Sequence, residues 1–262
     1  MPTLKSRLRS AANRMLRPLD LELGRPHEFA PPPPSRWTME GMLQRARNNG
    51  IRPASLIDLG AARGDWSRLA RRIFPEAAVL MVEPLEERRQ ALKQLGDEWS
   101  NTHFAPAVVG ETAGEVTFHV TDDLDGSGIY TGDHGHPPRT VPCETLDSLV
   151  ERHQLPAPFL VKFDTHGYEL PILAGATRTL AETCAIAMEV YNFQISPTAI
   201  RFWDMARHLE ELGFLCADLG DLMSRPGDGL LWQMDLLFLR KDHSCFQRQS
   251  YRENRGSESV NR

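Results

Sequence analysis

The sequence has few cysteines, no long apolar run and no excess of positive charge, and each absence disfavours a class of protein. Its cysteines form no C-x-x-C pair and have no histidine at zinc-ligand spacing, which disfavours a zinc site or a disulfide framework. The formal net charge of −5 disfavours a dedicated nucleic-acid binder. No apolar run approaches the length of a membrane span, and no secretory leader is recognisable. We therefore expect a reduced, cytoplasmic chain.

The 262 residues, 41% of them hydrophobic, are enough for one sizeable core, so we predict one domain with an extension at each end. Residues 1–36 are basic and end in the run Pro31–Pro34, which reads as a stiff polyproline spacer. Apolar residues at 4–19 recur at helical spacing among arginines. Such a helix either caps the domain or a partner subunit, or makes weak contact with an anionic membrane surface. The domain spans 37–241, and the polar residues 242–262 are predicted to be disordered.

Within the domain, strand patterns alternate with helix patterns, which predicts an α/β fold with a mostly parallel, seven-stranded sheet and helices on both faces. An insertion at 110–140 interrupts the alternation, and we assign it to the rim of the active site. It contains an alternating strand at 115–120 and two loop histidines, His134 and His136, which we interpret as solvated. We predict strands at 55–59, 78–82, 103–109, 159–163, 185–190, 214–218 and 233–239, and helices at 66–74, 85–95, 146–153, 168–180 and 198–212.

The most informative segment is D-L-G-A-A-R-G, residues 58–64, which follows an apolar strand and opens a helix. A dinucleotide fold needs G-x-G-x-x-G to close backbone amides on a pyrophosphate, and an acid at this point repels phosphate. A cofactor with a cationic head and no phosphate, such as S-adenosylmethionine, suits the turn better. We expect Gly60 and Gly64 to let the backbone pass under the methionine part, while Asp58 meets its ammonium directly or through water.

A second acid, Glu83, ends the next strand in the sequence V-E-P. An acid in this position binds both ribose hydroxyls of an adenosine. Pro84 keeps this edge of the sheet free of helix for one more residue. With Ala62 from the turn, these residues extend the predicted cofactor site.

A further strand runs into V-K-F-D-T-H-G-Y-E-L, residues 161–170, and brings Asp164 and His166 to the same sheet edge. A hydroxyl that accepts a methyl group must lose its proton, and either residue could act as the general base. Asp164 is also a candidate cofactor ligand, and its structural alternative is a helix N-cap. Glu169 is interpreted as a cap or an ion-pair partner near the helix start.

Glu189 interrupts the apolar run A-M-E-V, where a buried charge is expensive unless it is paired. We assign it to the wall of the acceptor pocket or to a pairing with His166. The acids at the strand ends could together hold a divalent cation. Because no adjacent D-D or D-N ligand set is present, we predict no metal.

With these residues in hand, the chain resembles the FkbM family of S-adenosylmethionine-dependent methyltransferases. The resemblance covers about residues 54–240, through I-D-L-G-A-A-R-G with V-E-P, then E-T-L-D-S-L, D-T-H-G-Y-E-L-P-I-L-A-G-A and A-M-E-V. It implies a Rossmann-like class I methyltransferase fold and O-methylation of a hydroxyl on a sugar, glycan, lipid or secondary metabolite. Two departures from the family pattern are Ala62, where Asn or His is commoner, and Thr165-His166-Gly167, where V-E-G is commoner.

The sequence therefore predicts an enzyme that uses S-adenosylmethionine and a small-molecule or glycan acceptor, with Asp164, His166 and Glu189 as the catalytic residues. Two alternatives are an NAD-dependent Rossmann oxidoreductase and a binding protein that retains the methyltransferase fold without catalysis. Neither the acceptor nor the oligomeric state follows from the sequence.

Overall fold

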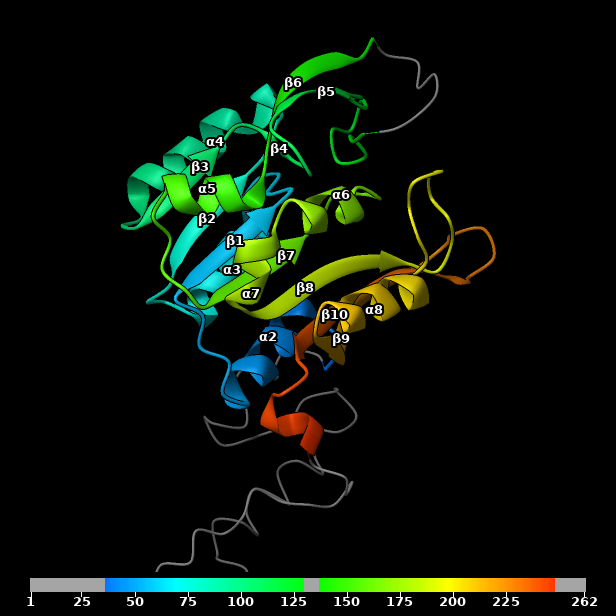
Figure 1. The fold of residues 1–262 in the computed structure, drawn as a ribbon. Coiled ribbons are helices and arrows are strands. Elements are labelled where there is room, and N and C mark those ends of the chain that lie inside the picture. The colour runs from blue at the N-terminus through cyan, green and yellow to red at the C-terminus, as the bar shows by residue number, and fades with distance from the viewer. Residues whose placement is uncertain (1–35, 130–136, 248–262) are drawn as a thin grey trace, which may run out of the picture. The chain divides into compact units, whose positions relative to one another are not determined.

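The computed structural model describes residues 36–129 and 137–247 (Figure 1). Its main sheet has seven strands in the order β3-β2-β1-β7-β8-β10-β9, and only β10 runs against the others. This agrees with the predicted seven-stranded, mostly parallel sheet. The strands are β1 (Ser55–Leu59), β2 (Ala78–Val82), β3 (Thr102–Ala105), β7 (Phe159–Phe163), β8 (Thr183–Tyr191), β9 (Phe214–Ser224) and β10 (Leu231–Arg240).

Helices cover both faces of this sheet, as predicted, because its central strands are apolar on both sides. One face packs against α2 (Met39–Asn48), α3 (Asp65–Ile73) and α4 (Glu86–Glu98). The other packs against α5 (Leu146–Arg152), α6 (Glu169–Ala174), α7 (Thr177–Ala181) and α8 (Phe202–Glu211). Within the described ranges, no helix is both long and apolar enough to cross a bilayer.

The predicted strand at 103–109 is divided by Pro106, which has no amide hydrogen to continue a ladder. Its first half is β3, and its second half, β4 (Val108–Val109), joins a separate three-stranded sheet in the order β4-β6-β5. The insertion supplies the other two strands, β5 (Gly114–Phe118), which was predicted, and β6 (Arg139–Glu144), which was not. Figure 1 shows this small sheet above the carboxyl ends of β1 and β2.

Other helices begin, end or divide at residues that differ from the prediction. The helix expected at 168–180 divides into α6 and α7 at Gly175, and the helix expected at 198–212 begins only at Phe202. Helix α2 was not predicted, although Thr38 caps it by accepting a hydrogen bond from the Gly41 amide. The tail expected from Asp242 begins with a short 3₁₀ helix, η3 (Ser244–Gln247).

The predictions on the chain ends and on two histidines of the insertion lie outside the described residues. These are the basic helix at 4–19, the polyproline spacer, the histidines at 134 and 136, and the tail from 248 onward.

The turn after β1 depends on a glycine at position 60. Gly60 has a φ of 77°, and a Cβ atom there would lie 2.0 Å from the backbone carbonyl oxygen of Asp164. Gly50 also has a positive φ, of 97°, but has no atom within 4 Å of a Cβ position. Substitutions at the two glycines can therefore separate the energetic cost of the backbone conformation from that of a steric clash.

We expect Gly60→Ala to lower the free energy of unfolding by about 3 kcal/mol or more, because it combines left-handed strain with backbone overlap. Gly50→Ala should cost only about 1 kcal/mol, from conformation alone. Urea unfolding followed by circular dichroism measures both. Equal losses in the two variants would show that the contact with Asp164 is not a constraint.

Candidate active site

The turn between β1 and α3 is tied to the end of β2 by hydrogen bonds. The Gly60 and Ala61 amides donate to the Val82 carbonyl, and the Ala62 amide donates to Oε2 of Glu83 at 3.0 Å. Ala62 has a φ of 46°, a left-handed conformation that a non-glycine residue rarely adopts. The turn and the acid at the end of β2 are thus one hydrogen-bonded unit.

Glu83 is buried and lines the cavity described below. Its Oε1 accepts a hydrogen bond from the Leu85 amide at 3.0 Å, while Oε2 holds Ala62. Burial raises the pKa of Glu83, and the two backbone donors oppose that rise. A carboxylate oxygen can accept more than one hydrogen bond, so Glu83 keeps capacity for a ligand.

Asp58 lies behind the turn. Its side chain is buried, accepts a hydrogen bond from the Ser67 hydroxyl at 2.6 Å and does not line the cavity. Burial raises the pKa of Asp58 to about 7, against the lowering effects of Ser67 and Lys162. Gly64 also lies away from the cavity, since a Cβ atom there would meet Leu95 at 2.5 Å.

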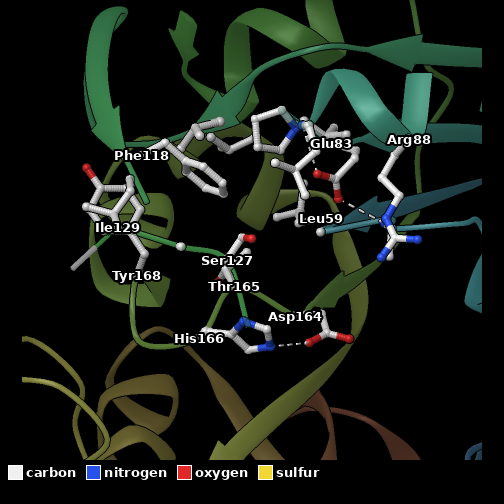
Figure 2. Close-up of a pocket in the computed structure, with 18 of the residues that line it drawn as sticks. Leu59, Glu83, Arg88, Phe118, Ser127, Ile129, Asp164, Thr165, His166 and Tyr168 are labelled. Atoms are coloured by element: carbon white, nitrogen blue, oxygen red, sulfur yellow. Dashed lines mark hydrogen bonds and ion pairs between the residues drawn. The ribbon is translucent and has the colours of Figure 1, made fainter. Parts of the chain in front are cut away.

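A cavity of about 320 Å³ opens at the carboxyl ends of the central strands. This is the place where open α/β sheets bind ligands. Figure 2 shows Glu83 and Arg88 at one end of the cavity and Asp164 and His166 at the other. The insertion lines it too, through Phe118, Leu124, Asp125 and the segment 127–129.

Asp164, His166 and Glu189 come together at one end of this cavity. Asp164 follows β7, His166 stands in the next turn with a φ of 51°, and Glu189 belongs to β8. The His166 Nε2 atom lies 3.4 Å from Oδ1 of Asp164 and 3.8 Å from Oε1 of Glu189. The proposed pairing of Glu189 with His166 is therefore present in the structure.

Charged neighbours set the protonation of this cluster. Burial alone would lower the pKa of His166, but Asp164, Glu189 and the Ser127 carbonyl raise it to about 9. Burial alone would raise the pKa of Asp164, yet Lys162 and His166 together hold it well below its usual range. Burial, then Asp164, raise the pKa of Glu189 to about 7.

Glu169 supports the turn that presents His166. Its Oε1 accepts hydrogen bonds from the Gly167 amide at 2.9 Å and from the Thr165 hydroxyl at 3.1 Å. Glu169 is buried and does not line the cavity. The contacts agree with its interpretation as a structural residue.

Sequence reasoning missed two buried cations, Lys162 and Arg88. Lys162 in β7 lies 3.3 Å from Oδ2 of Asp164 and 3.1 Å from Oδ1 of Asp235 in β10. The sequence signal for Lys162 is a lysine inside an apolar strand, because a buried charge needs a buried partner. Arg88 lines the cavity and pairs with Asp125 of the insertion at 2.5 Å. Nothing in the spacing of Arg88 pointed to this contact.

Among the described residues, Asp164, His166 and Glu189 also form a group that could hold a metal ion. One ligand atom from each lies within 4.8 Å of the other two.

Comparison with known sequences identifies the family. Residues 58–216 match the Methyltransferase FkbM domain, which is more than half of the chain. The protein belongs to the FkbM methyltransferase family. The match begins at Asp58 and includes the β1 turn, Glu83 and the cluster around His166. It confirms the predicted family, its class I methyltransferase fold and its cofactor, S-adenosylmethionine, and it favours a methyltransferase over an NAD-dependent oxidoreductase.

Solved structures that resemble the chain are distant from it. A methyltransferase FkbM from Methylobacillus flagellatus KT is 18% identical with a TM-score of 0.48, over 72% of this chain and 46% of that one. This chain therefore spans less than half the length of the Methylobacillus protein. No functionally curated protein matches the sequence.

Two further structures are methyltransferases solved with a cofactor or its product. The 1,6-didemethyltoxoflavin-N1-methyltransferase of Burkholderia thailandensis, with bound 1,6-didemethyltoxoflavin and S-adenosylhomocysteine, is 14% identical with a TM-score of 0.46 over 78% of this chain and 76% of that one. The magnesium protoporphyrin IX methyltransferase of Synechocystis PCC 6803, with bound S-adenosylmethionine, is 13% identical with a TM-score of 0.42 over 77% of this chain and 76% of that one.

The buried state of Asp58 predicts a stability effect that depends on pH. An acid with a raised pKa favours folding while it is protonated, so its contribution falls as the pH rises from its ordinary range near 4 to about 7. We expect Asp58→Asn to gain stability relative to the wild type between pH 5 and pH 8, by on the order of 2 to 4 kcal/mol.

Urea unfolding of both proteins at the two pH values measures this difference, with Asp65→Asn, an exposed acid of the same turn, as the control. A difference that does not change with pH would show that Asp58 is ionised throughout this range.

Proposed function

We propose that the protein transfers a methyl group from S-adenosylmethionine to a hydroxyl oxygen of a small-molecule, glycan or lipid acceptor. One observation supports this most strongly: the groups for donor and acceptor line a single cavity. Gly60, Ala62 and Glu83 line one part, while Asp164 and His166 line the other. A donor and an acceptor held in one cavity gain the advantage of proximity and alignment.

At the donor end, Glu83 accepts hydrogen bonds from the ribose hydroxyls. Pro84, Leu85 and Val108 line the same end of the cavity and supply the apolar walls that the adenine ring needs. Gly60 and Ala62 lie beside the methionine part. Asp58 lies behind the turn, where the cationic head of the cofactor would favour its ionised form.

At the acceptor end, the hydroxyl lies between the donor methyl and the Asp164, His166 and Glu189 cluster. A lone pair on the hydroxyl oxygen forms the new C–O bond while the C–S bond breaks, and its electron pair stays on sulfur. The hydroxyl proton passes to a carboxylate of the cluster, because His166, whose pKa is raised to about 9, already carries a proton at neutral pH. Alignment supplies most of the rate, and proton removal adds roughly 10²–10⁴-fold.

To test the reaction, the protein is incubated with S-adenosylmethionine that carries a label in its methyl group. Small-molecule and lipid extracts of the source organism supply the acceptors. We expect the label in a product that survives mild base, as a methyl ether does. Label released as methanol would mean a carboxylate acceptor. Cofactor binding without transfer to any extract would favour the non-catalytic alternative.

Glu83→Gln should weaken S-adenosylmethionine binding about 10- to 100-fold. The substitution removes the negative charge and replaces one oxygen of a carboxylate that accepts hydrogen bonds from the turn and, in this proposal, from the ribose. Isothermal titration calorimetry measures the dissociation constant. Glu86→Gln, which alters a neighbouring exposed acid paired with Arg89, is the control and should bind normally. Equal affinities of wild type and Glu83→Gln would remove Glu83 from the cofactor site.

His166→Ala should lower turnover roughly 10²–10⁴-fold while S-adenosylmethionine affinity stays within a few-fold of the wild type, because His166 lies at the acceptor end. Single-turnover transfer to an identified acceptor, together with calorimetry of the cofactor, separates the two effects. A large loss of cofactor affinity with normal turnover would place His166 at the wrong end of the cavity.

A further inference from the structure

The three donor atoms of the Asp164, His166 and Glu189 cluster face a common point. Nε2 of His166 lies 3.4 Å from Oδ1 of Asp164 and 3.8 Å from Oε1 of Glu189, and all three atoms fall within 4.8 Å of one another. Metal–ligand distances of about 2.1 Å bring ligand atoms to roughly 3.0–3.4 Å from each other. Small side-chain movements would therefore close this set around a metal ion.

Each of the three side chains is held by a group outside the cluster. The Ser127 backbone carbonyl interacts with the His166 ring and raises its pKa, and because Nε2 faces the carboxylates, Nδ1 is the nitrogen left for this contact. Figure 2 shows Ser127 beside the His166 ring, on the side away from Asp164. A bond from Nδ1 to a carbonyl is the usual way in which proteins fix a metal-binding histidine.

The two carboxylates are held in the same manner. Lys162 contacts Oδ2 of Asp164 at 3.3 Å, which leaves Oδ1 toward the cluster. Gln233 donates a hydrogen bond to Oε2 of Glu189, and the Tyr191 hydroxyl donates one to Oε1. These outer contacts orient one oxygen of each carboxylate toward Nε2 of His166.

The buried charges around the cluster are unbalanced. Asp164, Glu189 and Asp235 carry three negative charges when ionised, and Lys162 carries one positive charge. A metal ion would displace the proton of His166, because a metal-bound histidine is neutral, and two negative charges would then remain in a mostly buried site. A divalent cation cancels them, and buried charge is costly unless it is paired or bound to metal.

We propose that Asp164, His166 and Glu189 bind a divalent first-row metal ion, such as Mn²⁺, at the acceptor end of the cavity. One imidazole and two carboxylates form a borderline-hard donor set that suits such ions. The inference rests on the proposed function, because an ion here polarises the acceptor hydroxyl and eases loss of its proton. The sequence pointed away from a metal, since no adjacent acidic pair is present.

Titration of metal-stripped protein with Mn²⁺ alone, followed by the loss of the free-ion electron paramagnetic resonance signal, tests the site. We expect one saturable ion per chain. Glu189→Gln and His166→Gln should each weaken binding at least about tenfold, and Gln233→Leu, which removes an outer contact, should weaken it about 10- to 100-fold. Urea unfolding checks that each variant folds, and the Mn²⁺ affinity of any variant that folds tests the proposal.

The matched control is His153→Gln. His153 and His103 lie with ring centroids 4.8 Å apart, away from the cavity, and a histidine pair can bind metal adventitiously. Binding that survives in the cluster variants, binding lost in His153→Gln, or no saturable binding at all would overturn the proposal. Calorimetry with S-adenosylhomocysteine on the same samples separates the two proposals, since failure of the metal site alone leaves cofactor binding intact.

Discussion

The close approach of the β1 turn to the end of β7 is the constraint on which the site depends. Gly60 leaves no room for a side chain, because a Cβ atom there would lie 2.0 Å from the Asp164 carbonyl oxygen. The Asp164 amide in turn donates to the Leu59 carbonyl. These contacts fix the distance between the turn assigned to the donor and the cluster assigned to the acceptor, so that both can serve one methyl group.

Buried charge is the second organising feature, and it lies on neighbouring strands at one edge of the sheet. Asp58 lies in register with Lys162, and Lys162 also contacts Asp235, which lies in register with Glu189. Groups of opposite sign thus stabilise each other where the sheet would otherwise be apolar. The imbalance that remains is negative, which suits a cofactor with a cationic head and, by the further proposal, a metal ion.

Much of this could be predicted from the sequence, because the relevant signals are local. The strands at 55–59, 78–82 and 159–163 are apolar runs bounded by turn residues, and their predicted limits agree with the structure. An acid or glycine at the carboxyl end of a parallel strand points to the ligand-binding edge. The sequence therefore predicts Glu83, Asp164 and His166 at this edge.

The remaining features depend on contacts between distant segments. The three-stranded sheet requires β4 to pair with β6 across the insertion. The sequence pattern does not indicate β6 as a strand, because Pro142 lies within it. Asp58 points into the core instead of the cavity, because the Ser67 hydroxyl in α3 donates a hydrogen bond to its carboxylate there. The approach of His166 to Glu189 depends on the pairing of β7 with β8, two strands that α6 and α7 separate along the chain.

A crystal structure of the protein with S-adenosylhomocysteine tests the central claim most directly, namely that one cavity aligns donor and acceptor. We predict ribose hydroxyls within hydrogen-bond reach of Glu83 and the sulfur atom directed toward Asp164, His166 and Glu189. Product bound outside this cavity, or bound in it with the sulfur directed away from the cluster, would contradict the account.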